Sequence, residues 1–154
     1  MFRLTRQADY GILLMAEMAS HAGFAVLAAP DLAATTGMSV PMVSKTLKVL
    51  ASEGLLDSIR GPRGGYKLAR RAEDISIADI VTALEGPIAM TACSDGGEGD
   101  CVLEASCRVH ENWRKVNRVI IGALSRLSLA EMTQSEPPRL IMLEELSRPV
   151  TTRG

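Results

Sequence analysis

Aromatic residues are scarce in this chain of 154 residues, which holds one Trp, two Tyr and two Phe. The hydrophobic fraction of 47% is nevertheless high enough for a folded core, so disorder is not expected. Because Ala, Leu and Met are plentiful, the composition favours helices packed on helices over a large sheet. The length of the chain allows one domain, or one small domain with an extension.

Long apolar runs are also missing, and no stretch approaches the ~20 residues that a membrane span needs. The apolar stretch that follows Arg3 and Arg6 is interrupted by Glu17 and has helical spacing, which is unlike a signal peptide. We therefore expect a cytoplasmic protein without a membrane partner. We find no phosphate-binding loop or nucleophile motif, and neither His21 nor His110 has an evident catalytic partner, so an enzyme is not expected.

Charge is distributed unevenly, although the formal net charge is only −1. Residues 1–71 carry nine Lys or Arg against five Asp or Glu, residues 72–111 carry one against nine, and residues 112–154 carry seven against four. A basic N-terminal half followed by an acidic segment is typical of a nucleic-acid binder whose charges are sorted along the chain.

Residue spacing predicts a mainly α-helical fold. A nearly all-round apolar helix is expected over residues 5–21, a short one between Pro30 and Gly37, and a third over 39–53 with Ser39 as its N-cap. The short connection over 36–39 makes the last two a helix-turn-helix, with the third helix in the recognition role. A further helix is expected from Ser76 to Leu84, ended by the Gly86-Pro87 pair.

Two short strands, over 55–59 and 66–68, enclose the turn Arg60-Gly61-Pro62-Arg63-Gly64-Gly65. A hairpin directly after a recognition helix predicts a wing. Lysines on the recognition helix can neutralise phosphates, serines can reach base edges or phosphates, and arginines at a glycine-rich tip can enter a narrow minor groove. The candidate DNA-binding residues are Ser39, Ser44, Lys45, Lys48, Arg60 and Arg63.

A long helix from about residue 107 carries apolar residues at the heptad spacing of a helix–helix seam. These residues are Val109, Trp113, Val116, Ile120, Ala123 and Leu127. Little of the chain remains to cover them, so we expect a homodimer. A two-fold dimer would present two recognition helices to a palindromic operator in double-stranded DNA.

The only cysteines lie within an eighteen-residue window with a histidine: Cys93, Cys101, Cys107 and His110. The stretch between the first two is rich in glycine and acidic residues, which offers no apolar core to bury thiols. Soft thiolates on such a loop favour an iron–sulfur cluster or a tightly held zinc. Three cysteines in a reducing compartment also argue for metal or redox chemistry rather than disulfides.

These features together resemble the winged-helix regulators of iron–sulfur biogenesis and of nitric-oxide or redox response, the family that includes the IscR and NsrR proteins. The pattern is closest to the SUF-operon regulators of that family, and the resemblance covers about residues 2–132. The matching segments are Arg3-Leu4-Thr5 with Asp9-Tyr10, the wing from Arg60 to Tyr66, Leu84-Glu85-Gly86-Pro87, and the three cysteines before Trp113.

The resemblance implies a homodimeric repressor or activator whose iron–sulfur cluster is held by Cys93, Cys101 and Cys107. The fourth ligand is either His110, which is compatible with a 2Fe–2S centre, or the partner subunit's Asp9, which points to 4Fe–4S. We favour 2Fe–2S, although the gap between the first two cysteines is longer than in the best-known members. Because Ser44 stands where some relatives have a base-reading glutamate, their operator preference does not carry over.

The expected organisation is a winged helix-turn-helix domain over 1–87, a cluster-binding loop over 88–107, a dimerisation helix over 108–133 and a flexible tail over 134–154. The expected function is a transcription regulator of iron–sulfur assembly or redox and nitric-oxide response genes, in which the cluster alters operator affinity. Two alternatives remain from the residues alone: a structural Cys3His zinc site and a metal-free thiol switch.

Overall fold

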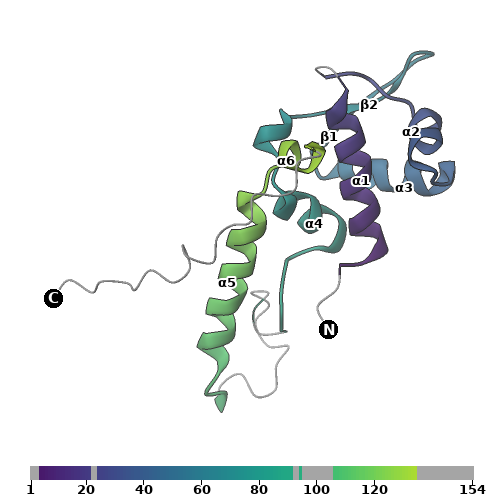
Figure 1. The fold of residues 1–154 in the computed structure, drawn as a ribbon. Helices are drawn as coiled ribbons and strands as arrows, with labels where there is room; N and C mark the ends of the chain where they lie inside the picture. Colours follow the sequence, from purple (N-terminus) through teal and green to yellow (C-terminus); the bar gives the residue numbers. More distant parts are fainter. Residues whose placement is uncertain (1–3, 22–23, 92–93, 95–105, 135–154) are drawn as a thin grey trace.

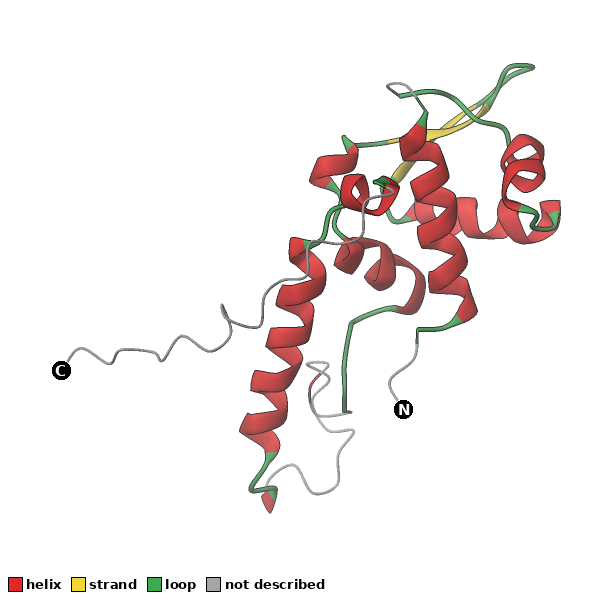
Figure 2. Ribbon diagram, viewed as in Figure 1, coloured by secondary structure: helices red, strands yellow, loops and turns green. Residues whose placement is uncertain are grey.

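The structure is a computed structural model that describes residues 4–21, 24–91, 94 and 106–134. It is mainly helical, with one two-stranded antiparallel sheet (Figures 1 and 2). This confirms the predicted fold class of a winged helix-turn-helix followed by a long helix. Among the described residues, no helix combines the length and apolar character required to cross a membrane. All but the first residue of the expected tail lie outside the described part.

Helix α1, Arg6–Ser20, lies at the centre of the fold and buries Leu14, Met15 and Met18. Its N-cap Thr5 accepts a hydrogen bond from a backbone N–H of the first turn, while the Thr5 N–H donates to Glu85 Oε1 at 2.8 Å. Gly11 lies directly against Leu84, so a side chain at position 11 would displace it. The Thr5–Glu85 hydrogen bond and the Gly11–Leu84 contact therefore join α1 to the C-terminal end of the helix over Ile77–Glu85.

Helices α2, Ala29–Thr36, and α3, Val40–Ser52, form the helix-turn-helix. Gly37 ends α2 with a left-handed backbone at φ 72°, a conformation that glycine adopts without steric cost. Ser39 occupies the predicted N-cap position of α3, but its side chain makes no capping hydrogen bond. Pro41 at the second helical position has no N–H to donate, which removes one of the two usual partners of an N-cap side chain.

The wing consists of β1, Leu56–Ile59, and β2, Gly65–Leu68, paired antiparallel with Leu56 opposite Leu68 and Ile59 opposite Gly65. Leu27 adds a third stretch of chain to this hairpin, because its backbone N–H and carbonyl both bond to Tyr66 at 2.9 Å. The Leu27 carbonyl lies so close to Gly65 that a side chain there would collide with it. The sequence pattern did not predict this additional pairing.

The 3₁₀-turn η1, Ala72–Asp74, leads into α4, Ile77–Glu85. Helix α6, Leu129–Thr133, packs against α1 and η1. Both helices begin with a capping box, Ser76 with Asp79 and Ser128 with Glu131. Hydrogen bonds from the backbone N–H and the hydroxyl of Ser128 hold the pKa of Glu131 below its usual value.

Two backbone hydrogen bonds join the beginnings of α4 and α6, from the Ile77 N–H to the Leu127 carbonyl at 2.9 Å and from the Leu129 N–H to the Ile75 carbonyl at 2.8 Å. Leu129 is fully buried in the core. The last part of the expected dimerisation segment, α6, therefore packs within the winged-helix domain.

Helix α5, His110–Arg126, extends away from the other helices (Figure 1). It begins three residues later than the sequence suggested. Of its seventeen residues only Asn117 is buried, whereas Val119 is 67% exposed and Trp113 and Val116 are also exposed. Leu127, the last residue of the predicted seam, is partly buried against the core of its own chain.

Candidate functional site

The outer face of α3 carries the predicted lysines. Val43, Leu47 and Leu50 are fully buried on its inner face, which turns Lys45 and Lys48 to solvent. Ser44 is half-buried and Ser39 is exposed just before the helix. The structure thus presents all four predicted residues on or beside one helix, and the two exposed cations can reach a phosphate backbone.

Two apolar residues on the same helix were not predicted as functional. Val40 and Met42, near the N-terminus of α3, are 43% and 41% exposed. The N-terminal residues of a recognition helix are those that usually reach base edges, and apolar side chains there can contact the methyl group of thymine. Met42 lies off the buried stripe of this amphipathic helix, which is the signal that could have identified it. Val40 lies on the same side as Leu47, seven residues later, so the periodicity gives no such signal for it.

The tip of the wing holds the predicted arginines, Arg60 and Arg63, and both are exposed. Gly61 has φ 111°, and the Gly64 N–H donates to the Gly61 carbonyl at 2.9 Å, which closes the turn. A side chain at Gly64 would collide with the backbone of Ile59. The glycines therefore give a narrow tip, and the hairpin projects beyond the helices on the side of α2 and α3 (Figure 1).

The predicted metal ligands are only partly described. Cys107 is half-buried and His110, the first residue of α5, has a side chain 19% exposed, while Cys93 and Cys101 lie outside the described residues. The His110 N–H donates to the Cys107 carbonyl at 3.4 Å, so one turn of chain brings these two candidate ligands together. The His110 Nδ1 atom also lies 3.6 Å from Glu111 Oε1.

A thiol and an imidazole one turn apart fit the donor chemistry of an iron–sulfur or zinc site. In the part of the chain that the structure describes, no group of three or more His, Cys, Asp or Glu side chains could hold a metal. Asp9 is exposed in the first turn of α1 and is not grouped with Cys107 and His110 in this chain. The prediction for Asp9 concerns the partner subunit and stays a prediction.

Asn117 is a polar residue that the sequence did not single out. It is 3% exposed, and its amide makes three hydrogen bonds to the chain before and within the cysteine segment. Nδ2 donates to the carbonyls of Ile88 at 2.9 Å and Ser94 at 3.2 Å, and Oδ1 accepts from the Met90 N–H at 3.1 Å. In the sequence, the one indication is that an asparagine, with its short polar side chain, directly follows Val116 of the apolar stripe.

A helix-turn-helix with an arginine-tipped wing and a long helix with an exposed apolar face defines the class of winged-helix DNA-binding proteins. The profile of the Rrf2 family, described as iron-dependent transcriptional regulators, matches residues 4–135, and the chain belongs to this family. The chain is thus a DNA-binding transcription regulator and not an enzyme, as the sequence predicted.

Individual relatives agree with this assignment. The chain is 32% identical to the protein aau3 of Rhizobium meliloti, over 97% of this chain and 98% of that one. It is 31% identical to the HTH-type transcriptional regulator IscR of Serratia proteamaculans, over 87% of this chain and 80% of the relative. Its fold matches the structure of T. potens IscR with a TM-score of 0.62 and 27% identity, covering 99% and 94% of the two chains. These similarities confirm the resemblance to IscR-type regulators.

Proposed function

We propose that this regulator binds a palindromic operator as a homodimer in the cytoplasm and senses through an iron–sulfur cluster at the beginning of α5. One observation carries the proposal. Candidate ligands Cys107 and His110 stand at one end of α5, and the other end of that helix leads through Leu127 into the core of the winged-helix domain. A change at the ligands is therefore mechanically connected to the DNA-binding domain.

The DNA-binding roles follow from where the side chains lie. Lys45 and Lys48 neutralise phosphates, Ser39 and Ser44 bond to phosphates or base edges, and Val40 with Met42 contacts thymine methyl groups. Arg60 and Arg63 at the wing tip enter the adjacent minor groove, where a narrow groove concentrates negative potential.

Cys93, Cys101 and Cys107 would hold the cluster with His110 as the fourth ligand, and the partner subunit's Asp9 is the alternative. A 2Fe–2S centre is favoured and 4Fe–4S is the second choice. A bound cluster would supply a redox- and oxygen-sensitive centre. Ligation would bring the thiols of Cys93, Cys101 and Cys107 together beside the start of α5, and α5 would pass that change to its pairing with the second copy.

The proposed division of labour is a DNA-binding domain over 1–87, a sensing loop over 88–107, a dimerisation segment over 108–133 and a tail over 134–154. Within the dimerisation segment α5 would make the contact between subunits, while α6 packs against α1 and η1 of its own chain. The exposed apolar face of α5, with Val109, Trp113 and Val116, is the proposed contact between subunits. The regulated genes would be those of iron–sulfur assembly or of redox and nitric-oxide response, as in the IscR-type regulators that the chain resembles.

The absorption spectrum of anaerobically purified protein, with iron and sulfide content, tests the cluster. We expect visible absorption that is lost in Cys93→Ala, Cys101→Ala and Cys107→Ala. A colourless protein with bound zinc would show a structural Cys3His site instead, and a metal-free protein that forms a specific disulfide on mild oxidation would show a thiol switch. Coloured protein whose three alanine variants keep their colour would overturn the ligand assignment.

A further inference from the structure

The buried amide of Asn117 joins α5 to the segment that precedes and enters the cysteine loop. Its three partners are backbone groups of Ile88, Met90 and Ser94, at 2.9, 3.1 and 3.2 Å. Ser94 is the residue that follows Cys93 in the sequence. Asn117 therefore bonds to residues that lie 23 to 29 positions earlier in the sequence, and one of them, Ser94, is the sequence neighbour of the candidate ligand Cys93.

Only an amide side chain satisfies this set of partners. Two carbonyl oxygens require donors and one N–H requires an acceptor, and asparagine supplies both from one planar group. A carboxylate could accept from Met90 but could not donate, and an aliphatic side chain would leave all three backbone groups without this partner in a partly buried place. Each such group costs free energy when it is removed from water without a partner.

A second set of hydrogen bonds stiffens the same segment. The Ser94 N–H donates to the Thr91 carbonyl at 2.9 Å, and the Thr91 N–H donates to Ser94 Oγ at 3.0 Å. Ser94 Oγ also donates to the Thr91 carbonyl at 2.8 Å. The residues on either side of the pair 92–93 are thus bonded to each other, and Asn117 fastens this unit to α5.

We propose that Asn117 is a positioning residue: it holds the backbone of Met90 and Ser94, on either side of Cys93 in the sequence, against α5, and this favours binding of one cluster by Cys93, Cys107 and His110. This inference rests on the proposed function, because it assigns the three groups to one cluster. Residues that orient metal ligands from outside the ligand set typically change metal affinity by roughly 10- to 100-fold when they are removed. Asn117 acts on the backbone beside a ligand and touches no metal.

The test compares Asn117→Leu with Asn112→Leu in the full chain. Asn112 is an exposed asparagine on the same helix, so the control makes the same chemical change without touching the segment 88–94. We expect Asn117→Leu to lose its visible absorption roughly 10- to 100-fold faster than wild type in the presence of an iron chelator. Asn112→Leu should match wild type within about twofold, which is the expected scatter for an exposed substitution.

A structural role alone would affect the metal-free protein as well. We therefore expect metal-free Asn117→Leu to bind non-specific duplex DNA within about twofold of wild type, because Asn117 is not among the residues of the hydrophobic core that holds the helix-turn-helix and the wing. Equal rates of cluster loss in the two variants would overturn the proposal. So would loss of DNA binding by the metal-free variant that parallels its loss of the cluster.

Hydrogen exchange of the wild-type protein provides a measurement that needs no variant. The Met90 amide, bonded to Asn117 Oδ1, should exchange much more slowly than an unstructured amide in the metal-free protein. Exchange of Met90 at the unstructured rate, with and without metal, would overturn the proposal even if Asn117→Leu failed to fold. If wild type held no cluster but protected Met90, the proposed sensing would fail while the contact itself stood.

Discussion

Two lysines of the helix-turn-helix and wing, Lys48 and Lys67, differ in what they can offer a phosphate. Lys67 on β2 lies 3.5 Å from Asp57 on the opposite strand, so part of its charge is already compensated within the chain. Within the described residues, Lys48 on α3 makes no ion pair and is exposed. A cation without an internal partner releases more counterions from DNA when it binds, which makes Lys48 the better single test of the interface.

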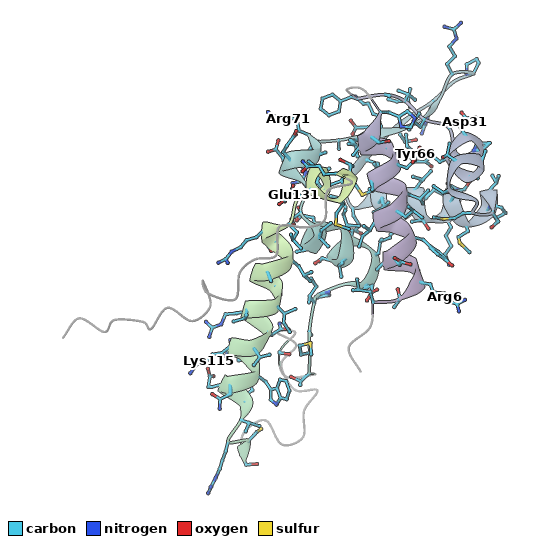
Figure 3. The ribbon with its side chains drawn as sticks, viewed as in Figure 1. Arg6, Asp31, Tyr66, Arg71, Lys115 and Glu131 are labelled. Carbon is cyan, nitrogen blue, oxygen red and sulfur yellow. The ribbon has the colours of Figure 1, made fainter. Side chains whose placement is uncertain are left out.

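Lys48→Ala should weaken binding to operator and non-operator duplexes alike and lower the slope of log K against log salt by about one, because one phosphate contact is lost. Fluorescence anisotropy over a series of salt concentrations measures both effects. Lys115→Ala is the matched control, since Lys115 lies on α5 at the far end of the molecule from Tyr66 at the wing (Figure 3). Identical behaviour of the two variants would remove α3 from the interface.

Gly65→Ala should destabilise the wing by roughly 1–3 kcal/mol, because the new methyl group would collide with the carbonyl of Leu27. Denaturant unfolding gives the change in stability, and Ser58→Ala on the neighbouring strand, whose side chain is exposed, serves as control. An unchanged unfolding midpoint for Gly65→Ala would show that Leu27 does not pack against the hairpin in solution.

Periodicity predicted Lys45 and Lys48 correctly as surface residues of α3, because a buried stripe on a helix specifies its opposite face. Asn117 could not be predicted in the same way. Its burial depends on a segment 23 to 29 residues earlier folding back onto α5, and no local pattern on the helix encodes that segment's path. The same limit applies to Cys93 and Cys101, whose mutual arrangement lies outside the described residues.

The beginnings of α4 and α6 show what local sequence can specify at the scale of an element. Each has a serine N-cap whose hydroxyl accepts from the third helical N–H, while an acidic side chain returns to the serine N–H. The Ser76–Asp79 spacing predicted the first of these from the sequence. The backbone pairing that joins the two caps could not be predicted, because main-chain hydrogen bonds between distant segments leave no side-chain signature.

Ser76→Ala should lower the free energy of unfolding by about 1 kcal/mol, the usual cost of a lost N-cap side chain. Urea or guanidinium unfolding measures it, with Ser125→Ala, an exposed change within α5, as the control. We expect the control to stay within about 0.5 kcal/mol of wild type. A Ser76→Ala variant as stable as the control would mean that Asp79 alone sustains the beginning of α4.

The candidate DNA-binding region and the candidate metal ligands lie at opposite ends of the molecule. The wing and α3 lie at one end, and the start of α5 lies at the other (Figure 1). Helix α5 begins at His110, whose N–H bonds to the Cys107 carbonyl. Between the two ends, Leu124 and Leu127 pack on the core, and the bonds between Ile75, Ile77, Leu127 and Leu129 fix the end of α5. Two copies paired along α5 would therefore hold their recognition helices at a set separation.

A single charged substitution on the exposed apolar face of α5 tests whether two copies pair along this helix. Val116→Glu should shift the protein from dimer to monomer and weaken binding to a palindromic operator far more than to a single half-site, because a buried carboxylate without a partner disfavours the contact. Sedimentation analysis gives the oligomeric state and anisotropy gives the two affinities. Ser125→Glu adds the same charge nine residues later, which the 3.6-residue period places on the opposite side of the helix. A Val116→Glu protein that remains dimeric would mean that the subunits meet elsewhere, and the separation of the recognition helices would then not be set by α5.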